Sequence, residues 1–87
     1  MSESKYKIII AKFLENKITV TQFIESFMVE WKADRDNDIS YNEKFQRLID
    51  RLFTSCDCYH EFPENDYEIT EKQLRQEVSS FSHIWFG

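Results

Sequence analysis

The sequence predicts an all-α protein: one domain, residues 1–87, folded as an antiparallel up-and-down four-helix bundle. Apolar residues recur at helical spacings of three and four in four separate segments. Three of these segments follow a Ser or Thr that has Glu or Gln three residues later, the capping-box pattern of a helix start. Gly occurs only at the last position and Pro only once, so hairpins with tight Gly turns are disfavoured. Mostly short links between the helices favour antiparallel neighbours.

The first two helices are expected in the N-terminal half. The first runs from about Glu3 to Glu15, and Asn16 after it is a residue type that often ends a helix in the left-handed conformation. Thr19 with Gln22 forms the capping box of the second helix, and the charged residues 33–38 are predicted to be a polar connection. The two apolar stripes are Tyr6, Ile9, Ile10, Phe13 and Leu14, and Val20, Phe23, Ile24, Phe27, Met28 and Trp31.

The other two helices are expected in the C-terminal half. Ser40 with Glu43 forms a second capping box and opens a helix that ends at about Cys56 or Cys58. A third box, at 70–73, pairs a Thr with a Gln and opens the last helix. The two apolar stripes are Phe45, Leu48, Ile49, Leu52, Phe53 and Cys56, and Leu74, Val78, Phe81 and Trp85.

Negative charge is concentrated around the longest connection, residues 59–69. Six acids and no Lys or Arg lie between Asp57 and Glu71, whereas the rest of the chain has ten acids and eleven bases. A connection this long is usually functional or disordered, and its aromatic residues and Pro63 argue against disorder. We therefore predict a contact surface for a positively charged partner. Its candidate residues are the acids Asp57, Glu61, Glu64, Asp66 and Glu68 and the aromatic anchors Tyr59, Phe62 and Tyr67.

Composition disfavours several classes of function. A net charge of −5 is opposite to that of nucleic-acid-binding domains, and no internal Gly is present to build a phosphate-binding loop. No nucleophile paired with a base is identifiable, so we predict no enzyme and no cofactor. No apolar run reaches the roughly 20 residues needed to cross a membrane, and no signal peptide is recognisable, so we expect a cytoplasmic protein.

Cys56, Cys58 and His60 form a string that resembles part of a metal site. Structural zinc sites need four ligands, usually in two pairs, and no second pair is present. We expect reduced thiols and no metal, with Cys56 in the core and Cys58 at its edge. A small metal-linked enzyme that uses these three residues is the least favoured hypothesis, and stoichiometric metal in the purified protein would support it.

Two parts of the chain resemble the colicin D immunity protein family, which includes immunity proteins of contact-dependent growth-inhibition systems. Residues 65–69, Asn-Asp-Tyr-Glu-Ile, followed by 74–78, Leu-Arg-Gln-Glu-Val, are similar to the start of that family's last helix. Residues 17–19, Lys-Ile-Thr, followed by Phe23 and by Val-Glu at 29–30, resemble the start of its second helix.

The resemblance implies a four-helix bundle that binds the toxic nuclease domain of a cognate bacteriocin or contact-delivered toxin, as a monomer in a 1:1 heterodimer. In the colicin D case the toxin is a tRNA nuclease, and acidic side chains at the end of the third helix and in the following loop imitate RNA phosphates. This chain differs by having Cys56, Tyr59 and His60 in that zone, so its acids are shifted along the sequence. The alternative hypothesis is a non-catalytic helical interaction module with an acidic docking loop for an unrelated basic partner.

Overall fold

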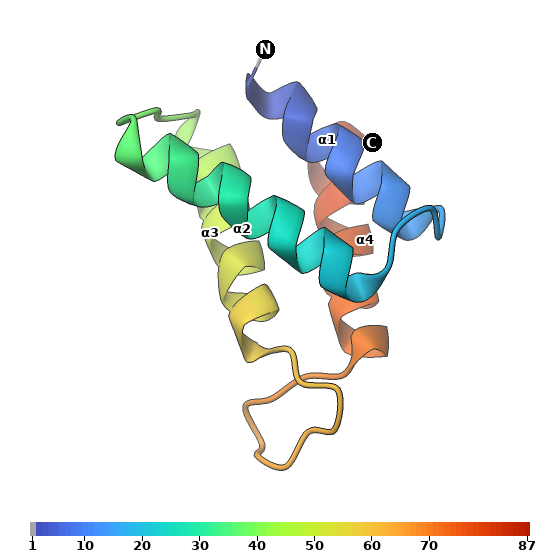
Figure 1. The fold of residues 1–87 in the computed structure, drawn as a ribbon. Helices are drawn as coiled ribbons and strands as arrows, with labels where there is room; N and C mark the ends of the chain where they lie inside the picture. The colour runs from blue at the N-terminus through green and yellow to red at the C-terminus, as the bar shows by residue number, and fades with distance from the viewer. Residues whose placement is uncertain (1) are drawn as a thin grey trace.

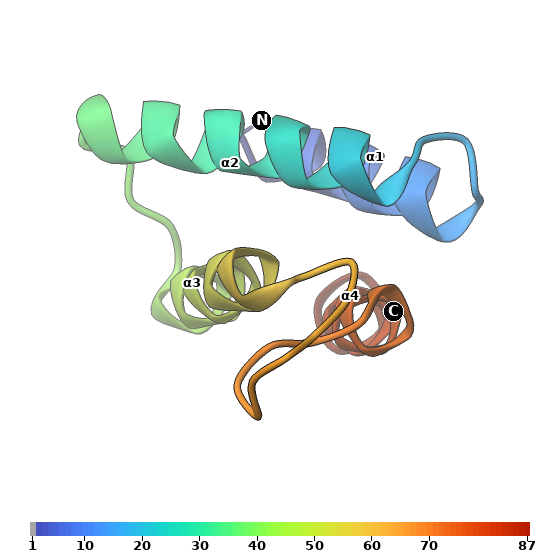
Figure 2. The same cartoon turned by 60° about the horizontal axis from the view of Figure 1, so that its bottom comes forward.

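The computed structural model describes residues 2–87, which form four α-helices joined by three connections (Figure 1). The helices are α1 (Ser2–Leu14), α2 (Val20–Asp36), α3 (Glu43–Cys58) and α4 (Glu71–Phe86). Contacts join α1 to α2, α2 to α3, α3 to α4 and α4 back to α1, and the predicted all-α, up-and-down bundle is confirmed. In Figure 2, α1 and α2 form one layer, and α3 and α4 form the other.

Side chains at the helix ends explain most of the boundaries. The capping boxes at Thr19 and Thr70 are present, and Asn16 has a positive φ of 61°, as predicted. The predicted Ser40 box is wrong, because Asn42 is the N-cap and its side chain accepts a hydrogen bond from the Lys44 N–H at 2.9 Å. Asn caps a helix as well as Ser does, and Asn42 stands directly before the first helical residue.

Helix α2 is longer than predicted. It continues to Asp36, so the first residues of the expected polar connection at 33–38 are helical. Asp34 lies seven residues after Phe27, on the same face of the helix, and only 7 % of its surface is exposed. The prediction placed Asp34 in a polar connection because it is charged, whereas in the structure Asp34 continues the buried face of α2.

The core consists of aromatic and aliphatic side chains from all four predicted stripes. Phe13 stacks on Phe23 with ring centroids 4.4 Å apart, and Trp31 stacks on Phe53 at 4.1 Å. Trp85 is half-buried and packs on the core. The fully packed residues are Tyr6, Ile10, Phe13, Phe23, Phe27, Phe45, Ile49, Leu52, Cys56, Leu74, Val78 and Phe81. The apolar periodicity therefore predicted the interior correctly. Within residues 2–87, no helix has the length and apolar character needed to cross a membrane.

Candidate interaction site

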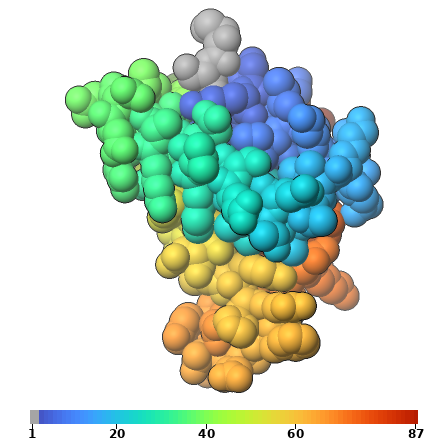
Figure 3. Space-filling view, viewed as in Figure 1, coloured from blue at the N-terminus to red at the C-terminus, as the bar shows by residue number. Residues whose placement is uncertain are grey.

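Residues 59–70 form the α3–α4 loop, which projects beyond the ends of the two helices it joins (Figure 1) and forms a separate lobe in Figure 3. The two ends of the loop are tied together by backbone hydrogen bonds. The His60 N–H donates to the Ile69 carbonyl at 3.1 Å, and the Ile69 N–H donates to the Cys58 carbonyl at 3.0 Å. Tyr59 and Ile69 also pack against the core, so the neck of the loop is fixed to the bundle.

Glu68 orders the interior of the α3–α4 loop. Its Oε1 accepts hydrogen bonds from the backbone N–H groups of Glu64 (3.0 Å) and Asn65 (2.9 Å) and from the Asn65 side-chain amide (3.0 Å). Backbone hydrogen bonds to the charged form lower the pKa of Glu68 below its ordinary value. The Glu68 carboxylate therefore has a role inside the loop, and its predicted contact with a partner stays a prediction.

Four other predicted acids, Asp57, Glu61, Glu64 and Asp66, are exposed on the last turn of α3 and on the loop. We call them the acidic surface. No Lys or Arg among residues 2–87 forms an ion pair with any of them. The loop and the last turn of α3 therefore present negative charge that no ion pair of the described residues compensates.

The three predicted aromatic anchors have different settings. Phe62 and Tyr67 are 73 % and 70 % exposed, so both leave a large aromatic side chain in contact with water. Tyr59 is half-buried against the core, and burial, together with Glu71 and Glu61, raises the pKa of its hydroxyl. Phe62 and Tyr67 are thus available to a partner, while Tyr59 holds the loop in place.

The Cys-x-Cys-x-His string does not form a ligand cluster. Cys56 is buried, and burial raises the pKa of its thiol to about 12, while Cys58 is half-buried. The His60 Nδ1 accepts a hydrogen bond from the Phe62 N–H at 3.1 Å. Across residues 2–87, no three His, Cys, Asp or Glu side chains are placed to hold a metal ion. Cys56 in the core and Cys58 at its edge agree with the prediction.

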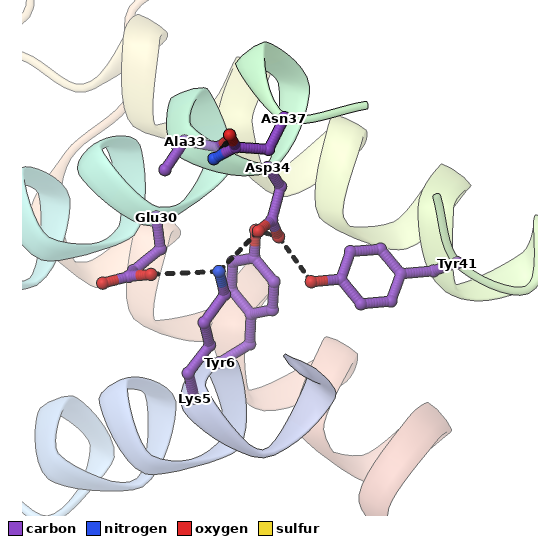
Figure 4. A network of polar contacts seen from close by, with 7 residues as sticks. All are labelled: Lys5, Tyr6, Glu30, Ala33, Asp34, Asn37 and Tyr41. Carbon is purple, nitrogen blue, oxygen red and sulfur yellow. Dashed lines mark hydrogen bonds and ion pairs between the residues drawn. The ribbon is translucent and has the colours of Figure 1, made fainter. Parts of the chain in front are cut away.

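A buried polar network surrounds Asp34, which the sequence pattern did not predict (Figure 4). The Asp34 carboxylate accepts hydrogen bonds from Lys5 Nζ at 2.6 Å, from the Tyr6 hydroxyl at 2.7 Å and from the Tyr41 hydroxyl. Lys5 also pairs with Glu30 at 3.0 Å. Burial alone would raise the pKa of Asp34, but these donors outweigh burial and the pKa is lower than usual. The available signal was the position of Asp34 on the apolar stripe.

Sequence analysis also missed a hollow of about 400 Å³ between α3 and α4, which we call the α3–α4 groove. The buried side chains of Leu52 and Phe81 are in its lining, together with the half-exposed Ile84. Tyr67 and Ile69 from the α3–α4 loop also contribute to the lining. Since all lining residues belong to α3, α4 and their loop, the groove opens away from α1 and α2. Helix periodicity shows which residues face a neighbour but does not show where two helices leave space.

A family model of bacterial self-protective colicin-like immunity matches residues 1–82. The chain belongs to this colicin-like immunity family. The predicted resemblance is therefore confirmed, and the family makes this a non-catalytic immunity protein whose partner is a cognate colicin toxin. No curated protein and no solved structure showed a significant match to the chain.

Proposed function

We propose that this immunity protein neutralises the nuclease domain, a tRNase domain, of a cognate bacteriocin or contact-dependent inhibition toxin. Its acidic surface imitates the phosphates of the RNA, and one immunity protein binds one toxin. The observation that carries the proposal is the group of four exposed carboxylates without ion pairs to residues 2–87, three on the projecting, internally bonded loop and Asp57 on the adjoining turn of α3.

A nuclease must present positive charge to the phosphates of its substrate. An enzyme that binds and cleaves a phosphodiester exposes Lys, Arg or His in its site, and an acidic surface is complementary to that field. Such complementarity raises association rates up to about 10⁸–10⁹ M⁻¹s⁻¹ at low salt. Speed is useful to an immunity protein, because newly made toxin has to be captured before it acts.

The order of the loop also favours tight binding. A loop that is flexible when free loses conformational freedom on binding, and this loss reduces affinity. Here the closed neck and the Glu68 hydrogen bonds fix the loop before the partner arrives. Phe62 and Tyr67 then supply apolar contact area beside the carboxylates, as aromatic residues do at the centres of interfaces.

The first test is charge reversal on the acidic surface. The double variant Asp57→Lys/Glu61→Lys should weaken binding by roughly 100-fold or more, because several charge pairs are reversed together. The control is Glu15→Lys/Glu25→Lys, which changes net charge equally at exposed positions outside the loop and should alter affinity by less than about threefold. Affinity is measured by titration of the full chain with its cognate toxin. Unchanged affinity of the first variant would remove the acidic surface from the mechanism.

A second test concerns RNA imitation. If the acidic surface occupies the phosphate-binding site, tRNA and the immunity protein should compete for a catalytically inactivated toxin, and adding tRNA should raise the apparent Kd. The control is the same competition with the Asp57→Lys/Glu61→Lys variant. Because this variant binds the toxin more weakly, tRNA should displace it at a lower concentration. A stable ternary complex of toxin, tRNA and immunity protein would contradict imitation, while leaving immunity itself intact.

A further inference from the structure

The α3–α4 groove is continuous with the α3–α4 loop. Tyr67 belongs to both, because it is exposed on the loop and also contributes to the groove lining. Figure 2 shows the loop displaced toward the side of the α3–α4 layer that faces away from α1 and α2. A partner that covers the exposed face of Tyr67 on the loop therefore also reaches the groove.

The groove has an apolar interior and a mostly uncharged rim. Leu52 and Phe81 contribute buried apolar surface, and exposed Ile84 contributes more. Among the described lining residues, Arg51 and Glu77 are the two that carry charge, and they pair across the groove at 3.5 Å. Both are partly exposed to solvent, and an exposed ion pair contributes little to stability. A partner can therefore displace this pair at small cost.

We propose that the cognate toxin inserts an apolar side chain into the α3–α4 groove, next to a basic residue that pairs with Glu77. This extends the proposed function and depends on it, since the toxin must approach through the acidic surface. The groove then distinguishes one basic toxin surface from another, whereas the acidic surface attracts all of them. Electrostatic attraction mainly sets the association rate, and a desolvated apolar contact mainly slows dissociation.

Charge favours the toxin over a second copy of this chain as the occupant. Two copies joined through this groove would bring two acidic surfaces close together, and the chain already has a net charge of −5. Like charges placed face to face in an interface oppose association. A cationic toxin surface has the opposite effect and gains from the same arrangement.

The experiment fills the groove and compares dissociation rates. Ser80→Trp places a large side chain in the groove, and Ser79→Trp places the same side chain at an exposed neighbouring position that does not line it. With the cognate toxin, Ser80→Trp should raise the dissociation rate about 30-fold or more. Its association rate and salt dependence should stay near those of the unaltered chain, and Ser79→Trp should change either rate by less than about twofold.

Two further variants test the groove with little risk to folding. Ile84→Ala should raise the dissociation rate about tenfold, while the matched exposed residue on α2, Val29→Ala, should not change it. Arg51→Gln should tighten binding about threefold, because it removes a cation that faces a basic partner and frees Glu77. Weaker binding by Arg51→Gln would contradict a basic residue at this position.

The outcomes separate this inference from the proposed function. If Ser80→Trp and Ile84→Ala bind like the unaltered chain while the Asp57→Lys/Glu61→Lys variant binds weakly, the groove proposal is wrong and the acidic surface stands. If the unaltered chain does not bind the toxin, the proposed function itself fails. Sedimentation of the free protein gives a further check, since a dimer that Ser80→Trp dissociates would assign the groove to a second copy and overturn the proposal.

Discussion

Asp34 and the acidic surface contain the same chemical group, a carboxylate, in opposite settings. Asp34 is 7 % exposed and accepts hydrogen bonds from Lys5, Tyr6 and Tyr41. The carboxylates of the acidic surface are exposed and form no ion pair with the described residues. The negative charge of Asp34 therefore acts on donors inside the fold. The negative charge of the acidic surface remains available to a partner.

The comparison separates stability from binding. The Asp34 network joins α1, α2 and the connection before α3, so it fixes how these parts pack (Figure 4). The acidic surface is attached to the bundle only through the last turn of α3 and the closed neck of the α3–α4 loop. Substitutions in the Asp34 network should therefore change the free energy of unfolding with little effect on toxin affinity. Substitutions on the acidic surface should change toxin affinity with little effect on unfolding.

The largest effect on folding is expected for Asp34→Asn. Removing the charge leaves Lys5 with a weaker acceptor and weakens the bonds from both tyrosines, so the free energy of unfolding should fall by about 3 kcal/mol. Urea unfolding followed by circular dichroism measures this change. The control Asp36→Asn, at an exposed residue, should cost less than about 0.5 kcal/mol. Equal losses of unfolding free energy in the two variants would contradict a special role for Asp34. A large loss of toxin affinity in the folded Asp34→Asn protein would contradict the separation of stability from binding.

The two regions should also differ in their response to salt. Between 50 and 500 mM NaCl, the association rate with the toxin should fall about tenfold or more, because the acidic surface acts through solvent. The free energy of unfolding should change by less than about 1 kcal/mol over the same range, since buried pairs are screened much less. Stopped-flow mixing and urea unfolding measure the two quantities. An association rate independent of salt would contradict the proposed role of the acidic surface.

Acid should weaken the Asp34 network. Because the pKa of Asp34 is lower in the folded protein, the network stabilises fully above the unfolded pKa of about 3.9 and loses this contribution as pH falls through the folded value. The difference in unfolding free energy between the unaltered chain and Asp34→Asn should be constant above about pH 5 and should narrow below about pH 4. A difference that widens in acid would show that the sign of the pKa shift is wrong.

The smallest effect is expected within the α3–α4 loop. Glu68→Ala removes the acceptor of the Glu64 and Asn65 amides, so both should exchange hydrogen faster, with little change in global stability. Toxin affinity should fall about threefold to tenfold, roughly 1 kcal/mol, because the loop must then be ordered on binding. Glu64→Ala removes one charge without loosening the loop and should leave the exchange of Asn65 unchanged. Unchanged exchange in Glu68→Ala would contradict an ordering role.

Most of the fold could be predicted because helix signals are local. The stripes around Phe13, Phe27 and Phe81 repeat within a few turns, and the two Thr capping boxes depend on residues three apart. The third helix start was misplaced because Ser40 and Asn42 are both good caps, and only tertiary packing decides between them. Asp34 was misplaced because two of its three donors, Lys5 and Tyr6, are 29 and 28 positions away, beyond the range of any local pattern.

The sequence predicted where the candidate interaction site lies, but it did not predict the role of each residue in it. Clustered acids and aromatics on one long connection marked the α3–α4 loop, and all eight predicted residues lie on it or on the adjoining turn of α3. The sequence does not distinguish Glu68, which bonds inside the loop, from Glu64, which is exposed. Likewise, Tyr59 and Tyr67 look equivalent along the chain, yet one is a structural anchor and the other is 70 % exposed. These differences depend on how the loop folds back on itself.

The closed neck has a consequence for how such proteins diversify. Because Tyr59 and Ile69 seal the base, the residues between them form a segment whose side chains can be exchanged without disturbing the helices underneath. A relative of this protein could therefore alter the charge that a toxin meets through the nine residues 60–68, whereas a change at the α3–α4 groove would require substitutions on the helices. The four helices would keep their folding free energy while the α3–α4 loop presents a different surface to the toxin.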